Sequence, residues 1–357
     1  MKIVDKRNLR GARLGLVFTA LSLIAACSSP GCSGGTVSSG VSSRGGGGGK
    51  SQGGQSITMP KRRPPWYRDI SRAKTAKESQ RVIAWLSEQG GGWGRGRFQI
   101  DFSMHVLTAK AGTSLTPFVP TEDHYTPDCD RNAVPLPAGG AVEGETGYAC
   151  TGDGDCHLLV YDPAKKLLYE MWRANLRGKR LFGGCLAVWD LKRAYGPSGR
   201  GQGCTSADAA GLPITPLLAR PDEVTRGEIR HALRFILPNA RIRRRAYVSP
   251  ATHSTNATRG GVLAPPYGAR FRLRADYPVG KLATKGAQVI ARALQRYGMF
   301  LADGGSITLT VESDRFRDAK WVGILGPHDL RALKVRDFEL VGHGPFMSYD
   351  GDCRRKP

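Results

Sequence analysis

Apolar and polar residues alternate along much of the chain, and this pattern predicts a protein built mainly from β-strands. Phe98, Ile100 and Phe102 share one side of an extended segment, while polar residues occupy the other side. Further strand-like runs follow, separated by turn residues: "HLLVYD", "LLYEMWRA", "CLAVWDL", "EIRHALRFIL", "AYVSPAT", "ARFRLRAD", "SITLTVES" and "FELVG". Many short strands in succession favour an antiparallel β-sandwich or a jelly roll.

Helical periodicity is confined to a few segments. Apolar residues recur at helix-like spacing between Thr75 and Gln89, and Gly90 follows as a stop signal. The segment "GAQVIARALQRYGMFLADGG" aligns Ile290, Leu294 and Leu301 on one face and predicts a helix that covers one sheet. "PHDLRALKV" predicts a further short helix. The expected fold is therefore mainly β with a few helices: a single antiparallel sandwich-like or jelly-roll-like domain covered by one main helix.

The N-terminus has the pattern of an export signal. Five basic residues precede the apolar run "LGLVFTALSLIAA", which is too short for an ordinary spanning helix of about 20 residues. The stretch "LIAAC" resembles the bacterial lipobox, in which the cysteine is lipidated and becomes the first mature residue. We therefore expect lipidation at Cys27, which would anchor the protein stably in a membrane. The alternative is an ordinary secreted protein in which Cys27 is incidental.

Composition then divides the rest of the chain. Residues 1–26 are the expected signal peptide, and residues 27–65 are a lipidated cysteine followed by a Gly/Ser-rich disordered tether. Residues 66–345 are expected to form one β-rich globular domain, followed by an exposed tail at 346–357. The expected location is the extracytoplasmic side of a cell membrane. Because Ser28 is not the aspartate that often retains such proteins at the inner membrane, the outer membrane is slightly favoured.

Charge and export together restrict the partners. The formal net charge is +23, and about +19 remains without the leader, which holds five positive charges and one negative charge. Such a basic chain commonly indicates nucleic acid, but export places it among lipid head groups and envelope polymers instead. We therefore expect a membrane partner through the lipid anchor, an anionic polysaccharide or envelope polymer as a further partner, and no nucleic acid. Solvated surface arginines are the alternative explanation of the charge.

The cysteines fit an oxidising compartment, because disulfides persist there. Seven of the eight cysteines remain when Cys27 is set aside, so one is free or intermolecular, and Cys32 in the tether is the candidate for it. Cys150 with Cys156, and Cys185 with Cys204, are candidate local pairs. No CxxC pair occurs, which disfavours a zinc site. We expect no metal and no cofactor.

Several longer blocks resemble a widespread group of secreted proteins, mainly bacterial with some eukaryotic members. The blocks are "CTSADAAGLPI", "GEIRHALRF", "YVSPATHST", "PPYGARFRLRADY" and "ALQRYGMFLADGGS", and the likeness runs from about Asp101 to Val341. Cys204 stands where that group commonly has Trp, and Gly304 where it commonly has Asn. The resemblance implies an extracytoplasmic β-rich fold, and it implies no reaction and no residue roles.

One histidine in "GEIRHALRF" interrupts an apolar row. On a strand, Ile229, His231, Leu233 and Phe235 would share a side, so His231 is either a hydrogen-bonded core residue or part of a cleft. In the cleft interpretation His231 would lie near Asp208 or His253. These three residues are the catalytic candidates for a polysaccharide hydrolase or lyase.

Other residues supply further candidate chemistry. Carboxylates for a glycosidase pair, or bases and cations for a lyase, could come from a larger set: Asp190, Asp208, Glu223, Glu228, Tyr267 and Arg270. Asp208 in "TSADAAGLPI" could instead cap a helical turn. Asp153, Asp155 and His157 could ligate a metal or form an acid–base pair, although a Gly-Asp turn before a strand also explains them.

Arginines form rows on two of the predicted strands. If the strands are neighbours, five guanidinium groups crowd one sheet face: Arg230, Arg234, Arg270, Arg272 and Arg274. Either acids such as Glu228 and Asp276 pair with them, or the face binds an anionic ligand. No GxSxG, P-loop, dinucleotide or HExxH motif occurs. The leading expectation is a lipid-anchored envelope protein that binds carbohydrate or another anionic polymer. A polysaccharide hydrolase or lyase around Asp208, His231 and His253 is the alternative, and a structural lipoprotein is the third.

Overall fold

A computed structural model describes residues 64–355, all of which belong to one compact unit. The expected signal peptide, Cys27, Cys32 and the tether lie outside the described residues. The described part is mainly β, as expected, and it contains three α-helices: α1 (Ser79–Glu88), α2 (Pro221–Thr225) and α3 (Lys285–Arg296). Five short 3₁₀ turns accompany them: Pro65–Tyr67, Thr215–Leu217, Asn239–Arg241, Val279–Lys281 and Val335–Asp337. No helix in this part is long and apolar enough to span a membrane.

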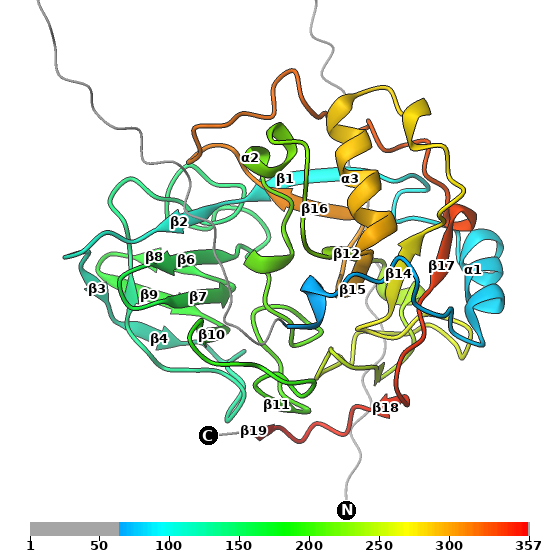
Figure 1. The fold of residues 1–357 in the computed structure, drawn as a ribbon. Helices are drawn as coiled ribbons and strands as arrows, with labels where there is room; N and C mark the ends of the chain where they lie inside the picture. Colours follow the sequence, from blue (N-terminus) through cyan, green and yellow to red (C-terminus); the bar gives the residue numbers. More distant parts are fainter. Residues whose placement is uncertain (1–63, 356–357) are drawn as a thin grey trace, which may run out of the picture. The chain divides into compact units, whose positions relative to one another are not determined.

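The largest sheet has six strands and is mixed rather than antiparallel. Its order is β1 (Ile100–Met104), β16 (Leu309–Glu312), β12 (Leu233–Leu237), β15 (Met299–Gly304), β14 (Arg270–Leu273) and β17 (Phe338–Leu340). The pairs β1–β16 and β12–β15 are parallel, and the other three neighbouring pairs are antiparallel. The expectation of an antiparallel sheet is therefore wrong for this layer. Figure 1 shows α3 against this sheet near β14 and α1 beside β17.

A second sheet of four strands has its own apolar cluster. Its order is β10 (Cys185–Asp190), β7 (Leu167–Trp172), β6 (Leu158–Asp162) and β2 (Val106–Thr108). Figure 1 shows it to one side of the six-stranded sheet. Smaller ladders complete the fold: β3 (Leu115–Thr116) with β5 (Val134–Pro135), β4 (Phe118–Pro120) with β9 (Arg180–Gly183) and β8 (Asn175–Arg177), β11 (Gly201–Gln202) with β19 (Arg354–Arg355), and β13 (Ala246–Tyr247) with β18 (Met347–Ser348).

One loop joins the two sheets through a buried carboxylate. Glu170 of β7 is fully buried and accepts hydrogen bonds from the backbone N–H groups of Ile214 and Thr215, the latter at 2.7 Å. It also accepts one from the Trp189 indole at 3.0 Å. A buried carboxylate is tolerated when several donors satisfy it. The loop of residues 203–217 is thereby fixed to the four-stranded sheet, while its Ala210 N–H bonds the Ala302 carbonyl of β15.

The predicted main helix ends earlier than its sequence pattern suggests. α3 stops at Arg296, and Gly298 then adopts a positive φ of 66° that reverses the chain. A Cβ at Gly298 would lie 2.4 Å from the Phe271 carbonyl oxygen, so only glycine fits this turn. The following residues "MFLADG" form β15, an interior strand with neighbours on both sides. The sequence of such a strand is a continuous apolar run, which is easily confused with that of a buried helix.

Three other expected elements also differ. The strand in "EIRHALRFIL" begins only at Leu233, so the residues before it do not alternate across a sheet. Only Ala246–Tyr247 of "AYVSPAT" is a strand, and "PHDLRALKV" forms turns rather than an α-helix. The C-terminal segment has mostly exposed side chains, but it is not a free tail, because β18 and β19 pair with β13 and β11.

The core of the six-stranded sheet is centred on an aromatic cluster. Trp93 contacts Phe98, Phe235 and Phe338 edge to face, with ring centroids 5.2–6.1 Å apart. Its indole N–H donates to the Leu333 carbonyl at 2.9 Å. Edge-to-face contacts add to the free energy of apolar burial.

We predict that Trp93→Ala lowers the free energy of unfolding by about 3–5 kcal/mol, because it leaves a large cavity and an unpaired carbonyl. Trp85→Ala on the half-buried side of α1 is the matched control and should cost clearly less. Urea denaturation followed by circular dichroism measures both. Equal losses in the two variants would contradict the central role of Trp93.

Candidate functional site

A row of polar side chains crosses one face of the six-stranded sheet. Asp101 of β1 is the register partner of Thr310 on β16, and the Arg234 guanidinium of β12 donates to Thr310 Oγ1 at 3.0 Å. The opposite face carries the apolar residues that alternate with them, such as Phe235. The alternation read from the sequence therefore places this polar row correctly on β1 and on β12 from Leu233 onward.

A β-bulge brings Asp303 into the same row. Phe235 pairs with Leu301, but Ile236 pairs with Asp303, so β15 contains one extra residue at this point. Without the bulge, Asp303 would point into the apolar face with Leu301. Bulges commonly re-aim a side chain near a functional site. Here the shift places the Asp303 carboxylate 3.8 Å from the Arg234 guanidinium.

Arg234 is buried between two carboxyl groups. Its Nη2 lies 3.0 Å from Asp208 Oδ2, and the Asp208 side chain is fully buried while that of Asp303 is 25% exposed. Burial raises the pKa of Asp208 to about 7, because the attraction of Arg234 offsets the burial effect only in part and Asp303 adds repulsion. Burial also raises the pKa of Asp303, against the opposing charges of Arg234 and His157.

A second polar network adjoins this row at Asp101. The imidazole of His157 contacts Glu143 at 2.7 Å through Nδ1 and the Ala207 carbonyl at 3.1 Å through Nε2. Ser103 Oγ donates to Glu143 at 2.8 Å and lies 2.9 Å from Asp101 Oδ2. Burial disfavours a charged His157, but the attraction and hydrogen bond of Glu143 outweigh it and raise the His157 pKa to about 9. His157 is therefore an imidazolium ion at neutral pH.

Apart from the buried Asp208, these groups line two adjoining cavities that share Asp155, Asp303 and Gly304. We call the pair the groove. The first cavity, of about 400 Å³, is bordered by aromatic and neutral polar side chains, among them Tyr125, Trp172, Asn239, His253, Asn256 and Tyr349. The second, of about 370 Å³, is bordered mainly by charged side chains, among them Asp101, Glu143, Glu145, Asp153, His157 and Arg234. Clefts with a few converging polar groups are typical ligand sites.

Asp155 reaches the groove from a loop before β6. It is exposed and accepts a hydrogen bond from the Trp172 indole of β7. The disulfide between Cys150 and Cys156 closes this loop, as the sequence predicted. The negative charge of Asp155 contributes to the raised pKa of Asp303, so the two carboxyl groups lie within electrostatic range of each other.

Among the predicted catalytic residues, Asp208 and His253 lie together and His231 lies elsewhere. Asp208 accepts a hydrogen bond from the Ala210 N–H, and His253 Nδ1 donates to the neighbouring Ala209 carbonyl at 2.7 Å. Asp208 is buried behind the groove and supports Arg234, whereas His253 borders the first cavity. Burial lowers the pKa of His253, and its Nε2 has no hydrogen-bond partner among residues 64–355.

His231 is a satisfied interior residue, so the core interpretation is confirmed and its place among the catalytic candidates is wrong. Its Nε2 lies 3.2 Å from Glu223, and its Nδ1 lies 2.8 Å from the Ala232 carbonyl. The residue precedes β12 and packs edge to face against the Tyr67 ring, away from both cavities.

The expected arginine face forms only in part, and its members are engaged in structural contacts. Arg230 and Arg274 are exposed and pair with Glu228 and Asp276, whereas Arg272 is buried and pairs with Glu339. Arg270 donates hydrogen bonds to the carbonyls of Tyr297, Pro65 and Arg68. Arg234 lines the second cavity of the groove. Arg234 and Arg270 both pair with Phe300 in the sheet register and so share one face with Arg272, whereas Arg230 precedes β12 and Arg274 follows β14. Structural pairing, rather than an anion-binding surface, explains them.

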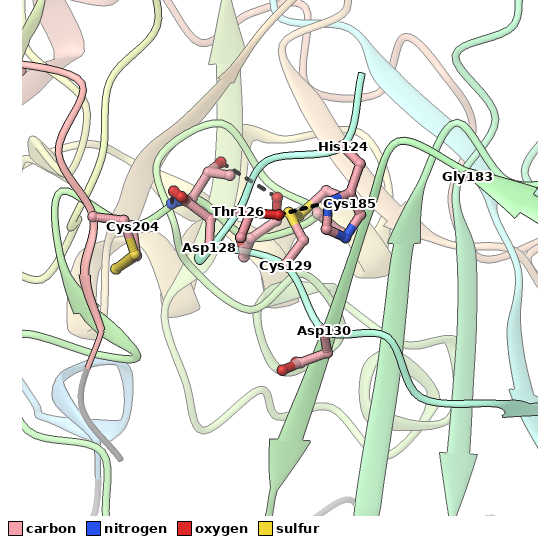
Figure 2. The surroundings of a disulfide bond; sticks show 12 residues. His124, Thr126, Asp128, Cys129, Asp130, Gly183, Cys185 and Cys204 are labelled. Atoms are coloured by element: carbon pink, nitrogen blue, oxygen red, sulfur yellow. Dashed lines mark hydrogen bonds between the residues drawn. A yellow bond between two sulfur atoms is a disulfide. The ribbon is translucent and has the colours of Figure 1, made fainter. Parts of the chain in front are cut away.

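The disulfide pairing differs from the prediction for two cysteines. Cys185 pairs with Cys129, and Cys204 pairs with Cys353, so Cys185 and Cys204 are not partners. Figure 2 shows the Cys129–Cys185 bond joining the loop of Asp128 and Asp130 to the start of β10. Cys204 lies beside that loop, and Asp128 accepts a hydrogen bond from the Thr205 N–H at 2.8 Å. The distant partners could not be inferred from spacing.

Two clusters of acidic and cysteine side chains have ligand-like spacing: Asp128 with Cys204 and Cys353, and Glu145 with Cys150 and Cys156. The cysteines in both are disulfide-bonded, so neither cluster offers a thiolate to a metal.

Sequence reasoning missed Asp303, Glu143 and Tyr349 as parts of the site. Asp303 lay in a segment interpreted as helix, and Glu143 lay in a stretch interpreted as irregular. The one available signal was the Asp153-Asp155-His157 series, all three of which border the groove, although a Gly-Asp turn was the favoured explanation of it.

Comparison with known proteins assigns neither a family nor a function to the chain. A scan against protein-family models, a search of curated proteins and a search of solved structures each gave no match to the chain.

We predict that Arg234→Met destabilises the fold by about 3–5 kcal/mol, because it leaves the fully buried Asp208 without its partner. Combining it with Asp208→Asn should recover at least half of that loss. Arg274→Ala, which breaks an exposed pair, is the control and should change stability by less than about 1 kcal/mol. Chemical denaturation of all variants at one pH provides the comparison, and strictly additive losses in the double variant would contradict the coupling.

Proposed function

We propose that the protein is a glycan-cleaving hydrolase of the cell envelope, with Asp303 and Asp155 as its carboxyl pair. The observation that carries the proposal is their placement at the junction of the two cavities, with the pKa of Asp303 raised and Asp155 open to solvent. Glycosidases need one carboxyl that donates a proton and a second carboxylate near the scissile bond. Differently placed carboxyl groups commonly divide these two roles.

The proposed reaction follows from those roles. Asp303 donates its proton to the glycosidic oxygen as the bond to the anomeric carbon breaks. Asp155 takes a proton from the water that attacks the same carbon. One proton leaves Asp303 and one arrives at Asp155, and exchange with solvent restores both groups. Arg234 and His157 hold positive charge close to Asp303 and limit the rise of its pKa.

The lining of the groove supports a neutral sugar polymer as the substrate. The second cavity contains six carboxyl groups, from Asp101, Glu143, Glu145, Asp153, Asp155 and Asp303, against the positive charges of Arg234 and His157. A polyuronate would meet net repulsion there. The first cavity offers Tyr125, Trp172 and Tyr349, whose rings suit the apolar faces of sugars, beside the amides of Asn239 and Asn256.

The expected binding of an anionic polymer loses its main support. It depended on free arginines, and those arginines are paired or buried. A glycan-binding protein without turnover would use the same groove, and the product assay below distinguishes it from a hydrolase. The lyase alternative lacks an unengaged arginine among the five candidates to neutralise a uronate carboxylate.

The envelope location continues to depend on the N-terminal pattern. Cys27 lies outside the described residues, so anchoring through a lipidated Cys27 stays part of the proposal. Three disulfides in the described domain agree with an oxidising compartment such as the periplasm or the cell surface.

We predict that residues 60–357 release new reducing ends from at least one neutral polysaccharide in a panel of neutral and acidic glycans. Asp303→Asn and Asp155→Asn should each lower kcat about 10²–10⁴-fold, as expected when a proton-transfer group is lost. Asp276→Asn, which alters an exposed carboxylate paired with Arg274, is the control and should retain activity. Retention on a polymer without new ends would identify a binding protein instead.

The rate should also depend on pH with a defined sign. Asp303 acts in its protonated form, so kcat/KM should fall about tenfold per pH unit once the pH exceeds the pKa of Asp303. Because burial raises that pKa, the fall should begin above the ordinary aspartate range near pH 4. A pH–rate profile that already declines at pH 4 would exclude Asp303 as the proton donor.

We predict that Cys27→Ser abolishes incorporation of radiolabelled palmitate when the full-length chain is expressed in a bacterium. Cys32→Ser is the matched control and should leave labelling unchanged. Labelling that survives in the Cys27 variant would show that the anchor lies elsewhere.

A further inference from the structure

The C-terminal residues 346–355, here called the strap, are docked at two points along the surface. Met347 and Ser348 pair with Tyr247 and Ala246, and Arg354 and Arg355 pair with Gln202 and Gly201. Arg355 also donates to the carbonyls of Pro127 and Asp128, at 3.0 and 3.2 Å. These contacts fix the path of the strap between its two ladders.

A disulfide fastens the same segment covalently. Cys353 of the strap pairs with the buried Cys204, 149 residues away along the chain. The glycines on either side of Gln202 allow the strap backbone to approach this segment closely. A Cβ at Gly203 would lie 1.9 Å from the Asp352 carbonyl oxygen, and one at Gly201 would lie 2.5 Å from that of Arg354. Glycine at positions 201 and 203 therefore leaves the room that the strap backbone needs to pack against this segment.

Between its two docking points the strap places Tyr349 at the groove. The Tyr349 N–H donates to the Arg245 carbonyl at 2.8 Å, and Arg245 Nε donates back to the Tyr349 carbonyl at 3.0 Å. The phenol ring packs edge to face on His253, with centroids 4.4 Å apart. Both residues border the first cavity. The strap is thus one wall of that cavity.

His253 has an unused acceptor at this wall. Its Nδ1 proton is held by the Ala209 carbonyl, its side chain is 5% exposed, and Nε2 has no partner among the described residues. Buried polar atoms without partners are uncommon and call for an explanation. Nε2 itself is buried, but His253 borders a cavity that also presents amides and aromatic rings, and a sugar hydroxyl entering that cavity is a donor of suitable chemistry.

We propose that the strap completes the substrate site: Tyr349 is a positioning residue that keeps His253 ready to accept a hydrogen bond from a sugar hydroxyl, and the Cys204–Cys353 disulfide holds it there. The proposal rests on the proposed function for its ligand, while the contact between strap and histidine does not. It follows that the site is fully assembled only in the oxidised protein. Reduction of this bond by an added dithiol, which is itself oxidised to a disulfide, would transfer two electrons and two protons and leave two thiols at Cys204 and Cys353.

The pKa of His253 reports whether the strap is docked, because Tyr349 of the strap packs on its ring. Burial lowers the pKa of the ring, while the Ala209 hydrogen bond and the charge of Asp128 oppose that effect. Removing Tyr349 or releasing the strap admits water to the ring. The pKa of His253 should then rise toward its ordinary value of about 6.5.

The experiment compares four variants with the wild-type domain: C204S/C353S, Tyr349→Ala, Tyr349→Phe and Phe346→Ala. NMR titration follows the His253 ring, and initial rates are measured on a neutral oligosaccharide that the wild type cleaves. We expect the first two variants to raise the His253 pKa and to raise KM about tenfold with kcat within about threefold. Tyr349→Phe keeps the ring, and Phe346→Ala removes a strap aromatic that does not border the cavity, so both should titrate as the wild type does.

The other outcomes are equally decisive. An unchanged His253 titration and an unchanged KM in both C204S/C353S and Tyr349→Ala would overturn the proposal. If C204S/C353S does not unfold cooperatively, Tyr349→Ala alone decides. If the wild type cleaves no glycan, the proposed function fails, and the titration by itself still accepts or rejects the strap. C150S/C156S controls for loss of a disulfide as such and should leave the His253 titration unchanged.

Discussion

A buried guanidinium between two carboxyl groups is the constraint on which the site depends. Arg234 lies in an interior strand, where an unpaired charge would cost several kcal/mol. Asp208 supplies the nearest carboxylate at 3.0 Å, and it comes from the loop of residues 203–217. The loop must therefore stay against the sheet for the charge to be tolerated. The same arrangement surrounds Asp303 with opposing effects of burial and positive charge, and burial wins, so its pKa is raised.

The same loop also joins the two main sheets. Glu170 holds its far end at the four-stranded sheet through the N–H groups of Ile214 and Thr215, and Asp208 holds its near end at Arg234. The groove lies where the polar row of the six-stranded sheet meets Asp155 and His157, which precede β6. A site built between elements in this way needs its walls fixed independently. Glu170 is a fully buried anchor for one wall, and the disulfides of Cys150 and Cys204 fix two others.

Charge is distributed unevenly in this molecule. The chain carries a formal net charge of +23, yet carboxyl groups predominate in the second cavity. The excess of arginine and lysine therefore describes the protein surface and its structural ion pairs rather than the groove. This separation explains how composition pointed toward an anionic ligand while the groove favours a neutral one. Total charge reports long-range attraction, whereas a site selects its ligand by the few groups that line it.

The alternation of apolar and polar residues along β1 and within β12, β6 and β7 determined that the protein is mainly β. It also placed Asp101 on the face opposite an apolar row. Both follow from sequence because side-chain direction in a strand depends on local geometry alone. Local spacing also identified the Cys150–Cys156 pair. Three other features were decided only by the tertiary structure: the parallel pairing of β12 with β15, the bulge that turns Asp303 toward Arg234, and the union of Cys204 with Cys353. Each joins residues far apart along the chain. His231 shows the same limit, since its neighbours Glu223 and Tyr67 come from other segments, and no local pattern could state whether it faces a core or a cleft.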